Sequence, residues 1–107
     1  MNKPKTYNYN ILLSAPIGKK SGTMTAVVID GKLEGLLRIM KNENYYNGQI
    51  DEKGNCEISG NIKTLMGTVE YSGTGYLNNK IIELCLNTGK IKLKVSGVSE
   101  SKGGGKP

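Results

Sequence analysis

The side chains that could carry chemistry in this chain of 107 residues are two cysteines, nine carboxylates and six tyrosines, because the sequence contains no histidine. Histidine is the commonest general base and the commonest metal ligand, so its absence removes Ser-His and Cys-His nucleophile pairs. Cys56 and Cys85 lack the spacing of a metal-binding or redox motif. We therefore expect no catalytic residues and no enzyme activity, no metal site and no cofactor.

Charge and cysteine content narrow the class of partner. The formal net charge is +6, but the lysines are scattered and tyrosine is the only aromatic residue type. Nucleic-acid-binding domains usually cluster basic residues and add stacking aromatics, so we expect no nucleic-acid partner. No stretch approaches the ~20 apolar residues of a membrane-spanning helix, and the first residues lack the apolar core of a signal peptide. Two free cysteines suit a reducing compartment, and we expect a cytoplasmic protein with no membrane partner.

Apolar and polar residues alternate along almost the whole chain, which is the pattern of half-buried β-strands. Turn signals such as Asp30-Gly31 and Asn78-Asn79, both suited to type I′ turns, separate the alternating segments. We expect one domain over residues 1–98 and a disordered, glycine-rich tail over residues 99–107. The predicted strands span residues 6–14, 22–30, 32–40, 45–51, 55–63, 68–77, 80–87 and 90–97.

Reflecting each strand about the following turn predicts a pairing register for the whole sheet. This register places one residue of each strand in a row across the sheet. Counting every second residue along each strand from that row places nearly all apolar side chains, including Ile58 and Ile62, on one face. Polar side chains such as Ser59 and Asn61 fall on the other face. The residues predicted to lie side by side in this row, one from each strand, are Tyr9, Ala26, Gly35, Gly48, Gly60, Gly73, Leu84 and Leu93.

A sheet with one apolar face must cover that face. Rolling up covers it and also removes the exposed edges. The sequence therefore predicts an all-β fold, an eight-stranded antiparallel up-and-down (meander) barrel in which the last strand closes on the first. A sandwich of two four-stranded sheets is the alternative.

The most unusual prediction is a band of interior glycines on adjacent strands beside interior tyrosines. Glycines there let strands curve tightly and let rings such as Tyr46 and Tyr71 lie over bare backbone. Alternatively, the missing side chains leave room for a small apolar or aromatic ligand, with tyrosine hydroxyls as polar handles. The candidate ligand-binding residues are Tyr9, Tyr46, Tyr71, Gly35, Gly48, Gly60 and Gly73.

Apolar residues on the predicted outer face indicate a second kind of site. The alternation places Leu36 opposite Thr25 and Leu12 opposite Thr23. Contiguous exposed apolar surface often marks an interface, and two-fold dimers are the commonest assembly. We expect a homodimer through a patch on the first three predicted strands, formed by Leu12, Val27, Ile29, Leu36 and Met40.

Three segments, residues 14–22, 30–35 and 63–71, resemble a family of small bacterial all-β proteins whose function is uncharacterised. They are similar to its T-P-x-G-x-x-x-G turn, D-G-x-L-x-G hairpin and L-x-T-x-x-G turn, with Ala15 in place of the usual Thr. Related segments can be joined to flavin-dependent oxidoreductases, and the resemblance implies an accessory role. The predicted architecture is also similar to calycins such as lipocalins and avidins, whose characteristic tryptophan this chain lacks.

Two functions remain open from the sequence. The first is a non-catalytic binding module that holds a small apolar or aromatic ligand inside the barrel. The second is a structural or interaction protein with a filled barrel that acts through its outer surface, for example as an accessory to a flavin-dependent oxidoreductase. An open interior favours the first function, and a closed, dry interior favours the second.

Overall fold

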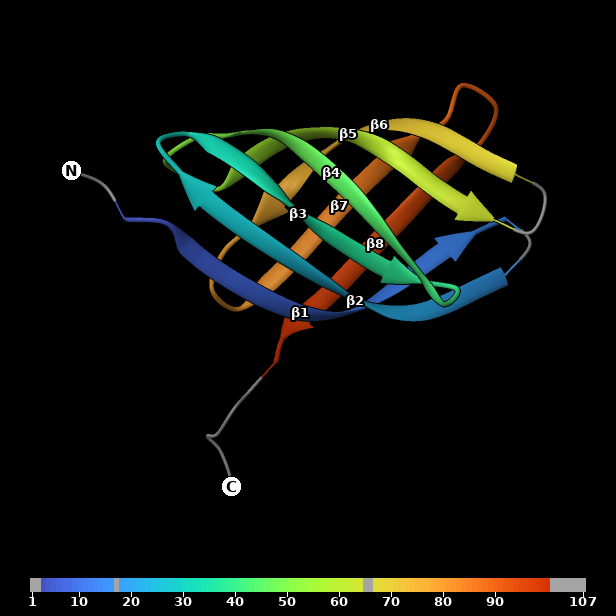
Figure 1. Ribbon diagram of the computed structural model, residues 1–107, viewed down its shortest axis with the longest axis horizontal. Helices are drawn as coiled ribbons and strands as arrows, with labels where there is room; N and C mark the ends of the chain where they lie inside the picture. The colour runs from blue at the N-terminus through green and yellow to red at the C-terminus, as the bar shows by residue number, and fades with distance from the viewer. Residues whose placement is uncertain (1–2, 17, 65–66, 101–107) are drawn as a thin grey trace.

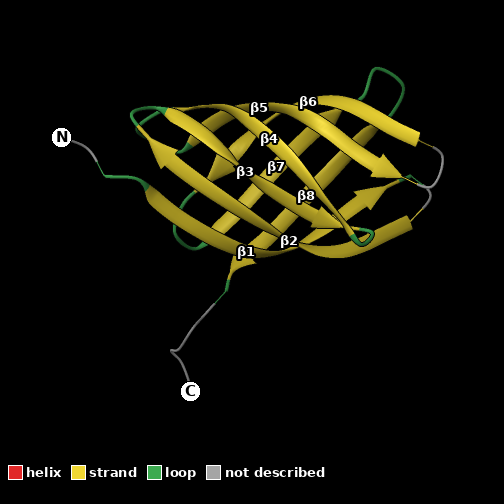
Figure 2. Ribbon diagram, viewed as in Figure 1, coloured by secondary structure: helices red, strands yellow, loops and turns green. Residues whose placement is uncertain are grey.

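All eight predicted strands form. The computed structural model describes residues 3–16, 18–64 and 67–100, in which each strand pairs with its sequence neighbours and β8 pairs with β1 (Figures 1 and 2). The all-β meander barrel is confirmed, and the sandwich alternative is wrong. The strands are β1 (Lys5–Ala15), β2 (Gly18–Ile29), β3 (Lys32–Ile39), β4 (Asn42–Ile50), β5 (Asn55–Thr64), β6 (Gly67–Leu77), β7 (Ile81–Asn87) and β8 (Lys92–Ser99).

The antiparallel order gathers the turns at the two ends of the barrel. One end, which we call the N-terminal end, carries the start of β1 and the turns after β2, β4 and β6. The opposite end carries the last residues of β1, β3, β5 and β7. Among the described residues, no helix is long and apolar enough to cross a membrane.

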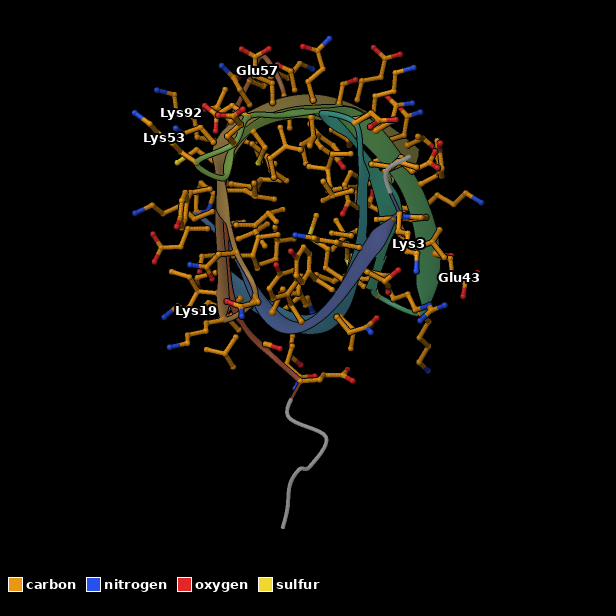
Figure 3. All side chains as sticks on the ribbon, turned by 90° about the vertical axis from the view of Figure 1, so that its left-hand side faces the viewer. Lys3, Lys19, Glu43, Lys53, Glu57 and Lys92 are labelled. Atoms are coloured by element: carbon orange, nitrogen blue, oxygen red, sulfur yellow. The ribbon has the colours of Figure 1, made fainter. Side chains whose placement is uncertain are left out.

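The predicted alternation divides the barrel into an apolar interior and a polar exterior. Ile58 and Ile62 are buried and Ser59 is exposed, as predicted. In a view along the barrel, labelled charged side chains such as Glu57 point away from the interior (Figure 3). The buried apolar core comprises Tyr9, Ile11, Leu13, Met24, Ala26, Leu33, Leu37, Ile39, Tyr46, Cys56, Ile58, Ile62, Tyr71, Leu77, Ile82, Leu84, Leu86, Leu93 and Val95.

Two residues predicted to be interior are exposed. Val69 is 37% exposed and Ile91 is 44% exposed. Val69 lies near the start of β6 and Ile91 lies in the turn before β8, so both stand at the end of the barrel away from the N-terminal end. The alternation rule fails there because the wall of neighbouring strands ends.

The predicted register is right for one hairpin and displaced by two residues in the other six. Ala26 lies opposite Gly35, as predicted. Tyr9, however, lies opposite Met24 instead of Ala26. Because every slip is by two residues, each strand still presents its predicted face to the interior.

Side-chain caps explain two of these slips. The Asn78 side-chain oxygen accepts the backbone N–H groups of Lys80 and Ile81 at 2.8 and 2.9 Å. Asn78 therefore opens a four-residue turn instead of standing at its centre, which moves the hairpin centre along the chain. Thr88 opens the turn after β7 in the same way, with its hydroxyl oxygen accepting the backbone N–H of Lys90 at 3.3 Å.

Of the two turns predicted to be type I′, one has the backbone conformation of that type and the other does not. Asp30 and Gly31 have φ values of 52° and 78°, as this turn requires. Asn78 and Asn79 are not among the residues with positive φ, so a type I′ turn is wrong there.

The turn after β3 lies earlier than predicted. Met40 and Lys41 adopt φ values of 53° and 65° and form a two-residue turn between the paired residues Ile39 and Asn42. Met40 is therefore no outward-facing strand residue; it is half-buried and packs against the core.

Asn44, predicted to lie in that turn, is instead a buried residue of β4. Its side-chain amide donates to the Leu37 carbonyl at 3.0 Å, and its oxygen accepts the Lys63 N–H at 2.9 Å. These bonds satisfy both polar groups of the side chain and join β3, β4 and β5.

Part of the predicted tail belongs to the barrel. Ser99 ends β8, and its backbone N–H donates to the Lys80 carbonyl at 2.8 Å. The backbone N–H of Glu100 donates to the Asn8 carbonyl at 2.9 Å. The remaining predicted tail, residues 101–107, lies outside the described residues.

The interior glycines do not share one level, so the predicted glycine band is wrong. The two-residue slips place a large side chain opposite each of these glycines. The cross-strand pairs are Gly35 with Tyr46, Gly60 with Tyr46 and Tyr71, Gly48 with Leu33 and Ile58, and Gly73 with Ile58 and Leu86.

The two faces of β5 give a direct test of this arrangement. Ile58→Ala should lower the free energy of unfolding by about 2–5 kcal/mol, because it removes buried apolar volume. Ser59→Ala should change it by less than about 0.5 kcal/mol, because that side chain is exposed. Urea denaturation of both variants measures the difference, and a larger loss from Ser59→Ala would contradict the structure.

Candidate ligand-binding site

A concavity opens at the N-terminal end of the barrel. Its volume is about 530 Å³. We call it the mouth, and Tyr7, Val28, Ile50 and Leu77 form its apolar lining. Tyr7, Val28 and Ile50 face inward but are only half-buried, so apolar surface meets solvent here. Small-molecule pockets typically measure roughly 300–1,000 Å³, and the volume of the mouth falls in this range.

Charged and polar side chains surround this lining. Lys5 comes from the start of β1, and Asp51, Glu52 and Lys53 come from the turn after β4. Asn78 and Asn79 of the turn after β6 complete the rim. The mouth therefore combines an apolar lining with both signs of charge at its edge.

The Asp51 carboxylate is already engaged within its own turn. One oxygen accepts the backbone N–H groups of Lys53 and Asn55 at 2.8 and 2.9 Å, and the other accepts the Asn55 side chain at 3.2 Å. The hydrogen bonds from Asn55, side chain first and backbone second, lower the pKa of Asp51. Asp51 is thus ionised at neutral pH and acts as the cap of this turn.

Tyr9 lies one inward-facing position deeper than Tyr7 on β1. Its ring centroid is 6.3 Å from that of Tyr7, and its hydroxyl donates to the backbone carbonyl of Asn78. Burial, followed by the influence of Tyr7 and Cys56, raises the pKa of Tyr9. The neutral, fully buried Tyr9 side chain therefore ties β1 to the turn after β6 beneath the mouth.

Two further buried tyrosines, Tyr46 and Tyr71, lie over glycines of neighbouring strands. The Tyr46 hydroxyl lies 2.9 Å from the position that a Cβ of Gly35 would take. The Tyr71 hydroxyl lies 2.9 Å from the corresponding position at Gly60. Each ring fills the space that its glycine leaves.

The two hydroxyls differ in their hydrogen bonds. Tyr46 donates to the Thr25 carbonyl at 2.8 Å. The buried Tyr71 hydroxyl has no hydrogen-bond partner within the described part of the chain. Burial raises the pKa of Tyr71 to about 12 and also raises that of Tyr46, so both are neutral at pH 7. An unsatisfied buried hydroxyl costs roughly 1–3 kcal/mol.

This difference predicts opposite effects of one substitution at two sites. Tyr46→Phe should lower the free energy of unfolding by about 1 kcal/mol, because it removes a buried hydrogen bond. Tyr71→Phe should raise it by about 1 kcal/mol, because it removes a buried donor that has no partner. Urea denaturation at neutral pH measures both. Equal losses in the two variants would show that the Tyr71 hydroxyl is paired.

The structure brings the three predicted site tyrosines together. It does not place the predicted site glycines side by side in one band. Tyr71, Cys56 and Tyr9 all lie close enough to Tyr46 to raise its pKa, after the larger effect of burial. A Cβ at Gly35 or at Gly48 would overlap a backbone carbonyl of the adjacent strand. A Cβ at Gly73 would lie 2.5 Å from Leu86 Cδ2, and one at Gly60 would lie 2.8 Å from the Tyr45 carbonyl oxygen. The glycines thus serve close strand packing, and a ligand contact by them stays a prediction.

The mouth itself was not predicted. The alternation predicts that Tyr7, Val28 and Ile50 face the interior, and all three pack against the core. The alternation does not show that they stand near strand ends that meet at one end of the barrel. Combining the interior face with strand polarity could have found this lining.

The two cysteines differ in burial, and the buried thiol is not an activated nucleophile. Both thiols are free; Cys56 is buried in the core and Cys85 is exposed. Burial, with a smaller contribution from Asp51, raises the pKa of Cys56 to about 11, which disfavours the reactive thiolate. In the part of the chain that the structure describes, no three His, Cys, Asp or Glu side chains lie together as a metal site would need.

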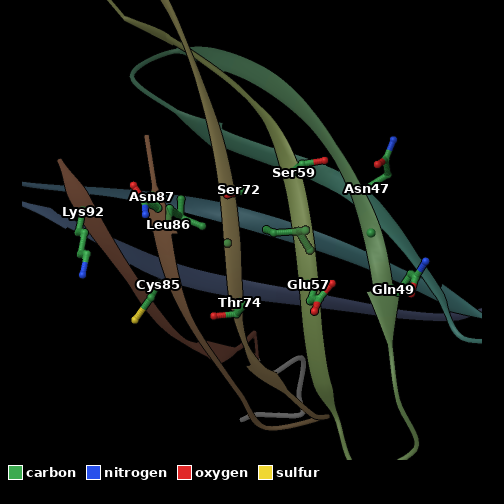
Figure 4. Close-up of a pocket in the computed structure, with 13 residues that line it drawn as sticks. Asn47, Gln49, Glu57, Ser59, Ser72, Thr74, Cys85, Leu86, Asn87 and Lys92 are labelled. Carbon is green, nitrogen blue, oxygen red and sulfur yellow. The ribbon is translucent and has the colours of Figure 1, made fainter. Parts of the chain in front are cut away.

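A second hollow, of about 720 Å³, lies on the outer side of the wall formed by β4 to β8 (Figure 4). Its outward-facing side chains are polar apart from one thiol, and no aromatic side chain lines it. Ile58 and Leu86 also line it, so it combines hydrogen-bonding groups with apolar side chains. The labelled lining residues are Asn47, Gln49, Glu57, Ser59, Ser72, Thr74, Cys85, Leu86, Asn87 and Lys92.

The predicted interface patch is rearranged. Leu36 lies opposite Thr25 as predicted, but Leu12 lies opposite Ser21 instead of Thr23, which moves it away from Leu36. Val27 and Ile29 are half-buried on β2, and Met40 packs against the core. On the other side of Leu36, its cross-strand partner Tyr45 is 55% exposed. The described outer surface therefore carries the Leu36–Tyr45 pair on β3 and β4 and a second apolar pair, Ile81 with Val98, on β7 and β8.

Among solved structures, the chain is similar to mFAP1, a redesigned beta barrel determined in complex with DFHBI. The two share the barrel fold. The TM-score is 0.58 with 10% sequence identity, and the match covers 89% of this chain and 93% of mFAP1. No family model and no curated protein matches the chain, so the resemblance to a bacterial family rests on its turn segments alone.

Proposed function

We propose that the protein binds a small apolar or aromatic molecule at the mouth of the barrel, without catalysis. The observation that carries this proposal is the half-buried lining of Tyr7, Val28 and Ile50 around a concavity of about 530 Å³. A ligand seated there would remove apolar surface from water, which is worth about 25 cal/mol per Å². The same lining explains why the ligand should be apolar or aromatic.

The likeness to mFAP1 supports a ligand-binding role, since that barrel holds DFHBI, a small aromatic dye. An eight-stranded barrel is just wide enough to be filled by its side chains or to hold one small molecule. In this barrel the deeper interior holds Tyr9, Tyr46 and Tyr71. The proposed ligand therefore lies above Tyr9, at the mouth.

The proposed lack of catalysis is supported by the chemistry of the side chains. The sequence contains no histidine. The pKa values of Cys56 and Tyr71 are raised to about 11 and about 12, away from the neutral range in which a general base or a thiolate works. Free cysteines support the proposed cytoplasmic location.

Blocking the mouth should abolish binding. In Val28→Trp the larger side chain fills the concavity, so affinity for DFHBI and for the neutral probe 2-naphthamide should fall at least about tenfold, as a lost apolar site implies. Val98→Trp is the matched control, because Val98 is 59% exposed on the outer surface. Equilibrium dialysis measures binding, and equal affinities for the two variants would place the ligand elsewhere.

A second candidate function uses the outer surface. Exposed Tyr45 lies opposite half-buried Leu36, with half-buried Val27 diagonal to Leu36. This surface favours association with a second copy or with another protein. The accessory role beside a flavin-dependent oxidoreductase, implied by the family resemblance, belongs to this candidate.

Leu36→Lys tests that candidate. The side chain faces outward, so the variant should keep the β-sheet circular dichroism spectrum of the wild type. A wild-type dimer should shift toward monomer, because the lysine charge would be buried in the interface. Sedimentation velocity over a concentration series measures this, and a wild type that stays monomeric throughout would remove the homodimer.

A further inference from the structure

Lys5 stands on the inward-facing side of β1 at the edge of the mouth. It precedes Tyr7 and Tyr9 at successive positions of the same face, and it lies opposite Val28 of β2. Its side chain is exposed, and it forms no ion pair with any other residue in the described ranges. A free ammonium group thus borders the apolar lining.

Among the described residues, neither acidic side chain of the rim forms an ion pair with Lys5. The Asp51 carboxylate accepts three hydrogen bonds from Lys53 and Asn55 inside its own turn. Glu52 and Lys53 are adjacent in the sequence, exposed and of opposite sign. Within the described residues Lys5 is left without an ion-pair partner beside the apolar lining of the mouth.

We propose that the ligand is an organic anion, with an aromatic or apolar body against Tyr7, Val28 and Ile50 and a carboxylate-type group paired with the Lys5 ammonium. This inference rests on the proposed function and specifies the charge of its ligand. The methylene stem of Lys5 adds apolar contact while its charged end stays at the rim. Water is partly excluded once the body is seated, which strengthens the ion pair.

Two probes of the same shape test the charge. 2-Naphthoate carries a carboxylate, and 2-naphthamide replaces it with a neutral amide on the same ring system. At neutral pH and low salt the wild type should bind the carboxylate about fivefold more tightly, the upper range for an ion pair at a surface. Raising the salt concentration should reduce this ratio, because salt screens the pair.

Two lysine variants locate the effect. Lys5→Gln keeps the length of the side chain and removes its charge, so the preference for naphthoate should vanish while affinity for naphthamide is unchanged. Lys92→Gln is the control, because Lys92 lines the outer hollow instead of the mouth. That variant should keep the wild-type ratio. Circular dichroism confirms that both variants fold.

The outcomes separate the two proposals. If the wild type binds both probes equally, or if Lys5→Gln keeps the preference, the anion inference is overturned while the binding function stands. Loss of the preference in Lys53→Gln with its retention in Lys5→Gln overturns the assignment to Lys5. A wild type that binds neither probe overturns the proposed function and the inference together.

Discussion

The barrel depends on one packing constraint, the pairing of interior glycines with large side chains on neighbouring strands. The Tyr46 ring lies over Gly35, and the Tyr71 ring lies over Gly60. The backbones approach so closely that a Cβ at Gly35 would overlap the Thr25 carbonyl. Glycine lets each strand coil, and the opposing side chain fills the space, so curvature and core filling are achieved by the same pairs.

This constraint also bears on where the proposed ligand would bind. Tyrosine and leucine side chains lie beside the interior glycines and are buried, whereas the interior face at the mouth is only half-buried. The Tyr9 hydroxyl, bonded to Asn78, separates the two regions. The proposed site therefore lies at one end of a barrel whose buried core is made of its own side chains.

The turns link the register to the site. Asp51 and Asn78 each accept backbone N–H groups two residues ahead, and those bonds set where the hairpins reverse. Both residues also stand on the rim of the mouth. The Asp51 carboxylate accepts its hydrogen bonds within its own turn and forms no ion pair with Lys5 in the described part of the chain, so local turn chemistry fixes where this negative charge lies on the rim of the proposed site.

The sequence by itself determined the eight strands, the closed meander barrel and the face on which nearly every side chain lies. These follow from alternation with a period of two, which survives any even slip in register. Tertiary structure alone decided the pairing of Gly60 with Tyr71, the burial of Asn44 and the different hydrogen bonding of two similar tyrosine hydroxyls. It also decided that Lys5 and Ile50, far apart in sequence, line one concavity. The physical reason is that these features depend on turn geometry and on closure of the barrel, which join residues through space rather than along the chain.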